Sequence, residues 1–523
     1  MLSAGAPAPA DRTQRGTLAP CTLCSLASAN PGADVSEHPP AAQQPADRIK
    51  WYVMASVGMG IFLSTIDGSI VNVALPSLVN ALNTQFATVQ WVVLAYLLTL
   101  ATVALSMGRL GDMLGKKPVY VTGFVIFTLG STLCGLSNSI QALIGFRVLQ
   151  ALGAAMLTAL GTAIVTETFP ARERGMALGV SGSLVSIGIV VGPTLGGLIL
   201  EVLSWHWIFF VNLPVGIAGT LMVLRFVPNL QPRGGQRFDF TGAGMLFVML
   251  LSLLLALSIG QTSGFTNPLV LGLFAAAAIF LPLFLLVESR VADPMIDLSL
   301  FRDRLFSVNL VTATLSFICL AGVTLLIPFF LEGVLGYNPA RVGLLMAVVP
   351  ISMGVLAPLA GSLSDRFGTR PMTVIGLALM LLGYVAIARM DRSESLSIYL
   401  LRFMPLGFGL GIFNAPNNSA VMGSAPQERL GVASGLLALT RILGQITGIA
   451  VLGALWATRV AAYAAALPAA GPSAAPPAAQ LSGLQDTMVV AAVVMVFASG
   501  LAVWALLIEH RKRQLPVTPS TGN

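Results

Sequence analysis

Charged residues are scarce in this sequence: they make up 9% of its 523 residues, whereas 56% are hydrophobic. An average soluble domain has roughly 25% charged residues. A chain of this composition has too little polar material to cover a water-exposed surface, which excludes a soluble globular protein. The net charge of +7 comes from basic residues that occur singly between apolar runs. No clustered basic face is formed, so we expect no nucleic-acid partner.

Groups that carry catalysis or bind metals are also few. The three histidines form no metal-binding cluster. Cys134 and Cys319 fall in apolar runs, and Cys21 and Cys24 form a single CxxC in a Pro/Ala-rich leader, which is a weak indication of metal or redox chemistry. No GxxxxGKS or GxxxxGKT loop occurs, so ATP is not the energy source. We therefore expect no enzyme, no metal and no cofactor.

Long apolar runs fill most of the sequence, each able to cross about 30 Å of hydrocarbon. Fourteen spans are predicted, which places both ends of the chain on one side. They are 51–79, 88–108, 117–137, 140–168, 175–200, 206–227, 239–260, 267–288, 305–332, 339–363, 371–390, 396–422, 431–458 and 485–508. Residues 1–48 are rich in Pro, Ala and Ser without periodicity, and we expect a disordered N-terminal extension there.

Arg and Lys divide unequally between the gaps that separate these spans. The tails and even-numbered gaps hold 21, the odd gaps hold four, and three lie inside spans. Basic loops are retained in the cytoplasm. The bias predicts that both termini and the even gaps are cytoplasmic, in a multi-pass protein of the cytoplasmic (inner) membrane.

A charged signature occurs twice, 253 residues apart, as GRLGDMLGKKP from Gly108 and GSLSDRFGTRP from Gly361. Arg147 pairs with Arg402 at an offset of 255, and four glycines of the fifth span recur at 256. A parallel repeat of this length is typical of transporters built from two similar bundles. The predicted domains are a first six-helix bundle (49–228), two inserted helices with linkers (229–304), a second six-helix bundle (305–510) and a cytoplasmic tail (511–523).

Two charged residues of the first bundle are predicted to lie deep inside spans. Asp67, in LSTIDGSIVNVALP, is costly at that depth if it is ionised and unpaired, and removal from water favours the protonated acid that a proton carrier needs. Arg147 stays charged and requires a partner, so we predict that it pairs with Asp67 and that breaking the pair couples proton release to conformation. The structural alternatives are an Asp67 that caps a helix break and an Arg147 that permanently ties two helices. The ninth span has no acid near its middle, and Glu332 falls at its outer end.

The two signature copies are predicted to form a cytoplasmic gate. A carboxylate at a helix end can dock on a neighbouring helix N-terminus or an arginine and hold the bundles together in one state. The alternative is a loop whose lysines only set orientation. Met113 stands where the second copy has Arg366, so Arg109 or Lys116 would have to serve in the first copy. The predicted gate residues are Gly108, Asp112, Gly115, Lys116, Gly361, Asp365, Arg366 and Gly368.

The fifth span contains GIVVGPTLGG, where Pro193 removes one backbone hydrogen bond and the glycines allow close helix approach. This predicts a kinked interface helix through Gly188, Gly192, Pro193, Gly196 and Gly197. Polar residues elsewhere in spans suit a hydrated substrate path, although hydrogen bonding between helices explains them equally well. The candidates are Gln150, Asn414, Asn417, Arg441 and Gln445.

From Lys50 to Glu509 these motifs resemble the fourteen-helix drug:proton antiporters of the major facilitator superfamily, a multidrug efflux family. The Asp67 motif, the RxxQGxG motif of the fourth span and the GxxxGPxxGG motif of the fifth match in order, except that Ala151 replaces the first glycine of RxxQGxG. The resemblance implies an all-α membrane fold of two six-helix bundles plus two inserted helices. It also implies proton coupling through Asp67 and Arg147, and it implies export, because GxxxGPxxGG marks antiporting exporters.

The leading hypothesis is therefore an antiporter driven by the proton gradient that exports amphipathic or cationic organic compounds by alternating access. The expected partners are the small organic substrate, protons and lipid, with a periplasmic adaptor if the host is Gram-negative, and the expected state is a monomer. The alternative is a proton-coupled carrier of one metabolite, with uptake as an open direction. A membrane sensor or enzyme on the same scaffold is a third class, which the absence of catalytic clusters disfavours.

Overall fold

The computed structural model describes residues 44–170, 173–229, 240–290, 298–393, 395–424, 430–464 and 471–514. These described residues are almost entirely helical and contain no strand. Among them, 13 helices are long and apolar enough to cross a membrane, and Gly244–Gly260 is a shorter apolar helix. The predicted all-α fold is confirmed. Most of the predicted N-terminal extension, including Cys21 and Cys24, and the last residues of the tail (515–523) lie outside the described residues.

Each predicted crossing has its helix, and several crossings are broken in two. The first half consists of α1 (Gln44–Ala81), α2 (Phe86–Val89), α3 (Trp91–Leu114), α4 (Lys116–Gly135), α5 (Ile140–Thr168), α6 (Arg174–Val202), α7 (Trp207–Phe210) and α8 (Asn212–Phe226). The inserted pair is α9 (Phe240–Ser263) and α10 (Pro268–Glu288). The second half consists of η1 (Leu298–Arg302), α11 (Arg304–Phe329), the π-helical turn η2 (Phe330–Val334), α12 (Pro339–Met346), α13 (Val348–Phe367), α14 (Thr369–Ile387), α15 (Leu396–Ser424), α16 (Leu430–Tyr463), η4 (Pro472–Ala474) and α17 (Pro477–Gln514).

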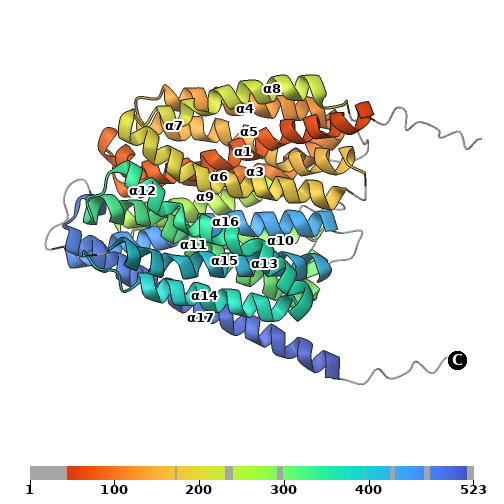
Figure 1. The fold of residues 1–523 in the computed structure, drawn as a ribbon. Helices are drawn as coiled ribbons and strands as arrows, with labels where there is room; N and C mark the ends of the chain where they lie inside the picture. The colour runs from red at the N-terminus through yellow and green to blue at the C-terminus, as the bar shows by residue number, and fades with distance from the viewer. Residues whose placement is uncertain are drawn as a thin grey trace, which may run out of the picture. The chain divides into compact units, whose positions relative to one another are not determined.

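Residues from Asp47 onward form one compact unit, and the description that follows concerns that unit. Its helices run side by side, with the first half above and the second half below in Figure 1. The first turns of α1 and the last turns of α17 lie at the same end, on the right of Figure 1. We call this the inner end and the opposite one the outer end. Termini at one end agree with an even number of crossings.

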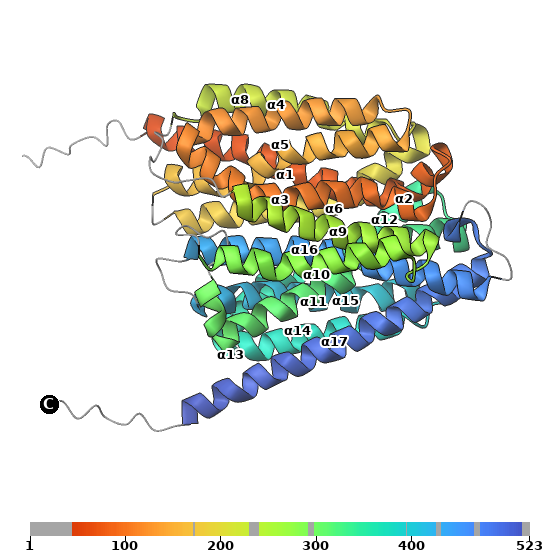
Figure 2. The ribbon, with the colours of Figure 1, turned by 180° about the vertical axis from the view of Figure 1, so that it is seen from behind.

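The inserted helices cover a seam between the two halves, where α9 is visible in the reverse view (Figure 2). Helix α9 contacts α3 of the first half and α16 of the second. It buries Leu246, Leu250 and Leu254, which are spaced four residues apart and therefore lie on one helix face. Trp91 Nε1 donates a 2.8 Å hydrogen bond to Ser258 Oγ. The inserted pair thus packs as part of the bundle.

Matched glycine contacts show that the two halves pack alike. A Cβ added at Gly123 on α4 would lie 3.2 Å from the carbonyl oxygen of Gly153 on α5. One added at Gly376 on α14 would lie 2.8 Å from the carbonyl oxygen of Gly409 on α15. Such glycines let helices approach at backbone distance. The contacts fix the register: α4 corresponds to α14 at an offset of 253, and α5 to α15 at 256.

That register corrects one pair predicted from the sequence. At an offset of 256 the counterpart of Arg147 is Phe403, so the predicted pairing with Arg402 was wrong by one residue. Phe403 is buried in the core. Arg402 instead donates from its guanidinium to the carbonyl oxygen of Arg389, near the outer end of α15. The sequence match between two arginines was coincidental, because the glycine contacts decide which residues are equivalent.

The two halves meet closely at the outer end. A Cβ added at Gly197 on α6 would overlap the carbonyl oxygen of Pro339 and lie 3.0 Å from the Cα of Gly343 on α12. Beside this contact, Asn338 Nδ2 donates a 3.0 Å hydrogen bond to Glu201 Oε1. Since glycine at 197 and 343 allows backbone contact, the structure is closed between α6 and α12 at this end.

Candidate functional site

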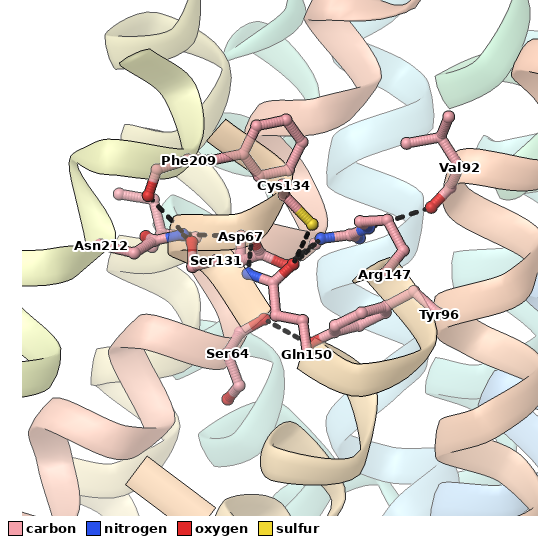
Figure 3. Close-up of polar contacts among 12 residues, drawn as sticks. Ser64, Asp67, Val92, Tyr96, Ser131, Cys134, Arg147, Gln150, Phe209 and Asn212 are labelled. Atoms are coloured by element: carbon pink, nitrogen blue, oxygen red, sulfur yellow. Dashed lines mark hydrogen bonds and ion pairs between the residues drawn. The ribbon is translucent and has the colours of Figure 1, made fainter. Parts of the chain in front are cut away.

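A fully buried ion pair lies where α1 and α5 cross in the first half (Figure 3). Arg147 Nη1 lies 2.6 Å from Asp67 Oδ2, and both residues are 0% exposed. The predicted pairing of these two residues is therefore present in the structure. A buried pair of this kind is stable only when its remaining donors and acceptors are also satisfied.

Two amides complete the shell around the carboxylate. Gln150 Nε2 donates to Asp67 Oδ1 at 2.8 Å, and Asn212 Nδ2 donates to the same oxygen at 3.1 Å. Gln150 Oε1 in turn accepts from Arg147 Nη1 at 2.7 Å. Gln150 lies one helical turn from Arg147 on α5, so both side chains project from the same face. Asp67 thus receives three donors, one charged and two neutral.

The rest of the arginine is held by α3. Its Nε donates to the carbonyl oxygen of Val92 at 3.0 Å. Its guanidinium carbon lies 4.2 Å from the centre of the Tyr96 ring and 5.9 Å from that of Phe209, within the range of cation–π attraction. The site therefore joins α1, α3, α5, α7 and α8, and its central ion pair links α1 to α5.

Sequence reasoning missed three polar residues of this site. Asn212 begins α8 and also donates to Ser131 Oγ at 3.0 Å, and that hydroxyl donates to the carbonyl oxygen of Phe209 at 2.8 Å. Tyr96 forms one wall. Asn212 stands inside an apolar run in FFVNLP, so the depth argument applied to Asp67 would also have found it. Ser131 and Tyr96 carry no such signal, because hydroxyl groups in apolar helices commonly bond to their own backbone.

The chemistry that this arrangement supports is proton binding. While Arg147 is in contact, the carboxylate of Asp67 is compensated. If Arg147 withdraws, an ionised carboxylate would remain buried without a counter-charge, and uptake of a proton removes that cost. No group of three His, Cys, Asp or Glu side chains suited to a metal ion occurs among the described residues.

The predicted substrate-path residues separate into two places. Gln150 belongs to the Asp67 site. The others lie on α15 and α16, where Asn417 is buried with Oδ1 unpartnered and Arg441 Nη2 donates to Asn418 Oδ1 at 2.9 Å. The same arginine lies 5.5 Å from the ring centre of Phe317. The other two candidates have fewer described polar contacts. Asn414 Nδ2 lies 4.0 Å from Met353 Sδ, and Gln445 is half-buried.

Each signature copy forms a turn on a glycine with positive φ. Gly115 links α3 to α4 at φ 94°, and Gly368 links α13 to α14 at φ 88°. Only glycine adopts such angles without strain, which explains why both copies carry it. Arg366 is exposed. A Cβ added at Gly108 would meet no described atom within 4 Å. The side chains of Asp112 and Asp365, and Gly361 beyond its place on α13, lie outside the described residues.

Three described basic residues of the two copies contact helices of their own half. Lys116 Nζ lies 2.5 Å from Glu167 Oε1 of α5. At the repeat-related positions, Lys117 donates to the carbonyl oxygen of Leu224 at 2.9 Å and Arg370 pairs with Glu509 at 3.1 Å. These bonds fasten the start of α4 to α5 and α8, and the start of α14 to α17. A bond between the halves from either signature stays a prediction.

The glycine-rich helix α6 packs on the stretch of α1 that carries Asp67. A Cβ added at Gly188 would lie 3.0 Å from Thr65 Cβ, and one added at Gly192 would overlap Ser69 Oγ. Gly196 continues the same face against Ile70. The hydroxyl of Ser69 also donates to the carbonyl oxygen of Gly188 at 3.1 Å. Pro193 and Gly197 lie on this helix too, so α6 contacts α1 on one face and α12 on another.

The sequence model of the Major Facilitator Superfamily matches residues 57–238 and 240–449 of this chain. The chain belongs to this superfamily. It is a multi-pass membrane transporter and not an enzyme. The riboflavin transporter RibZ of Clostridioides difficile (strain 630) is 36% identical over 409 residues, which cover 78% of this chain and 88% of RibZ. The multidrug resistance protein Stp of Mycobacterium tuberculosis (strain CDC 1551 / Oshkosh) is 34% identical over 417 residues, 80% of this chain and 78% of Stp.

Solved structures show the same fold. A bacterial homologue of the human lysosomal transporter Spinster, in an inward-facing and unoccupied conformation, aligns with a TM-score of 0.63 at 18% identity. The alignment covers 88% of this chain and 97% of that one. The nucleoside transporter NupG aligns with a TM-score of 0.59 at 13% identity, covering 87% and 99%. At these identities the likeness concerns the fold alone.

Proposed function

We propose that this transporter is a proton-coupled antiporter that exports amphipathic or cationic organic compounds across the cytoplasmic membrane. The observation that carries the proposal is the fully buried Asp67, whose described charged partner is Arg147. A permanent carboxylate at this depth is costly. A carboxylate that alternates between an ion pair and a protonated acid can instead drive a cycle.

The path from helix movement to proton binding runs through α6. Helix α6 packs on α12 at Gly197 and on α1 at Gly188 and Gly192, beside Asp67. Opening the outer end separates α6 from α12 and shifts α1 against α5, which pulls Asp67 away from Arg147. Asp67 then takes a proton from the outer side, and closure returns Arg147 and releases that proton to the cytoplasm. Substrate moves outward in the same cycle.

The export direction is supported by the GxxxGPxxGG motif of α6 and by the relatives. Besides Stp, the tetracenomycin C resistance and export protein of Streptomyces glaucescens is 31% identical over 423 residues. The charge bias of the loops supports cytoplasmic termini. Substrate would therefore enter from the cytoplasm or the inner leaflet.

Everted membrane vesicles with a pH-gradient dye test this proposal. An amphipathic cation should release protons from vesicles of the wild type and not from those of Asp67→Asn. The matched control is Asp303→Asn at the N-cap of α11, where asparagine caps as well as aspartate. Release that persists in Asp67→Asn would refute the coupling role. Compounds that accumulate in cells rather than leave them would refute the direction.

A second candidate is a carrier dedicated to one metabolite, which the likeness to RibZ favours. The same vesicle assay separates the two when riboflavin and several unrelated cations are compared. Proton release with riboflavin alone would favour the dedicated carrier, whereas release with several cations favours the multidrug exporter.

A further inference from the structure

A cavity of about 600 Å³ lies at the outer end, between the two halves. One wall comes from the end of α1 and the turn before α2, and the opposite wall comes from the end of α11 and η2, with η4 adding a third side. Its lining residues are Pro76, Val79, Asn80, Asn83, Thr84, Gln85, Phe329, Glu332, Gly333, Gly336, Tyr337, Ser473 and Ala474. Pro76 follows Asp67 by nine residues on α1, about 14 Å along the helix. The cavity is therefore separate from the Asp67 site.

Glu332 supplies the one formal charge among the lining residues. Its Oε1 is buried and has no hydrogen-bond partner in the described part of the chain. The guanidinium of Arg341 stacks on the ring of the lining residue Tyr337, 3.7 Å from its centre. A buried acceptor without a partner is costly. A cation bound in the cavity would compensate the charge of this carboxylate, and would do so without a hydrogen bond to the buried oxygen.

The backbone at Glu332 is specially shaped. Helix α11 ends in the π-helical turn Phe330–Val334, where the amide of Leu335 donates to the carbonyl oxygen of Phe330 at 3.1 Å, five residues back. Gly336 ends the turn at φ 65°. Single π-helical turns occur frequently at functional sites because they redirect side chains. Here the turn places Glu332 in the cavity wall.

Aromatic rings form the inner boundary of the cavity. Phe329 lines it and also packs against Phe86 of the first half, with ring centres 5.0 Å apart. Phe86 lies 4.6 Å from Trp456 of the second half. Aromatic faces attract organic cations. The cavity thus lies just outside an aromatic contact between the halves, with one carboxylate and aromatic walls.

We propose that this outer cavity is a binding site for a monovalent organic cation, with Glu332 as the counter-charge and Phe329 and Tyr337 as aromatic walls. Its volume is in the range of sites for drug-sized ligands, about 300–1,000 Å³. The site would be reached from the outer side. It goes beyond the proposed function, because occupancy requires neither a proton gradient nor a particular transport direction.

The test is ligand protection of a cysteine placed in the cavity. Ala474→Cys is exposed and lines the cavity, so in right-side-out vesicles without a gradient it should react with a membrane-impermeant maleimide, with the parent chain as background. Tetraphenylphosphonium should slow the labelling. Adding Glu332→Gln should raise the tetraphenylphosphonium concentration needed to slow labelling at least about tenfold. Glu332→Asp in its place should keep much of the protection, because it retains the carboxylate. Tetraphenylborate has the same shape and the opposite charge, and it should not protect.

The matched control is Glu201→Gln, which changes a carboxylate at the outer end that does not line the cavity. Protection should be unchanged there. Equal protection in the Ala474→Cys chain with and without Glu332→Gln would overturn the proposal. Protection by tetraphenylborate would also overturn it. Protection should also survive Asp67→Asn, and its loss there would overturn a separate outer site. A wild-type chain that shows protection but no substrate-driven proton release would count against the proposed function alone.

Discussion

The two halves of this transporter share one packing scheme but not one chemistry. Gly188 contacts Thr65 of α1, and its equivalent Gly444 contacts Phe317 of α11, where an added Cβ would lie 2.8 Å from Phe317 Cβ. Thr65 therefore corresponds to Phe317, and α1 to α11 at an offset of 252. Asp67 then corresponds to Cys319. At the α5 to α15 offset, Arg147 and Gln150 correspond to Phe403 and Leu406. All three equivalents are buried.

The second half shows that this scaffold packs with uncharged side chains at these three positions. An ion pair removed from water is at best weakly stabilising, and apolar groups of similar volume often replace it without loss. Cys319, Phe403 and Leu406 are such a replacement. The comparison therefore predicts that Asp67 and Arg147 are not needed to hold α1 and α5 together, which favours a role in the transport cycle over a permanent tie.

The largest expected effect separates stability from coupling at this site. Arg147→Met leaves the carboxylate of Asp67 buried without its counter-charge and should cost about 3–5 kcal/mol of stability. The double variant Asp67→Asn/Arg147→Met should recover most of that stability and still not transport. Unfolding in mild detergent measures the first effect, and vesicle transport measures the second.

Arg402→Met is the control for that experiment, since this arginine is partly exposed and its described bond goes to a carbonyl group. It should cost about 1 kcal/mol or less. A double variant as unstable as Arg147→Met would mean that the ion pair does hold the helices together, contrary to the comparison of the halves.

An intermediate effect is expected where the halves meet. Gly197→Ala forces a methyl group against the backbone of α12, and such overpacking costs about 1–3 kcal/mol. The outer end should open more often, and disulfide cross-linking between Glu201→Cys and Asn338→Cys should fall. Gly179→Ala on the same helix has no described atom within 4 Å of the added Cβ and should leave cross-linking unchanged. Equal yields in both variants would mean that α12 adjusts to the methyl group.

The smallest effect compares the two signature copies. Arg370 donates to Glu509 and to Asn309 Oδ1, whereas the described bond of Lys117 goes to one carbonyl oxygen. Arg370→Ala should cost about 1 kcal/mol, because Glu509 is partly exposed, and Lys117→Ala less than about 0.5 kcal/mol. Detergent unfolding measures both. A larger loss for Lys117→Ala would reverse the order of the two anchors.

Much of the architecture follows from the sequence. Apolar runs of membrane-crossing length set the number and approximate ends of the crossings, because every backbone polar group must be paired inside a helix in hydrocarbon. The cost of charge at that depth also identified Asp67 and Arg147 as partners. The repeated glycines also indicated the two signature turns, because glycine is the residue that adopts positive φ without strain.

The tertiary structure alone decided which residues are equivalent and what surrounds them. The glycine contacts between helices, and not the identity of residue types in the sequence, showed that Phe403 is equivalent to Arg147. Helix packing brought Asn212, Tyr96 and the carbonyl oxygen of Val92 to the ion pair from two further helices. The sequence could not predict these contacts, because hydrogen bonds between helices depend on how each helix is rotated about its axis and shifted along its neighbour. An apolar helix sequence is compatible with many such rotations and shifts. The outer cavity at Glu332 likewise exists only where the ends of α1, α11 and η4 meet.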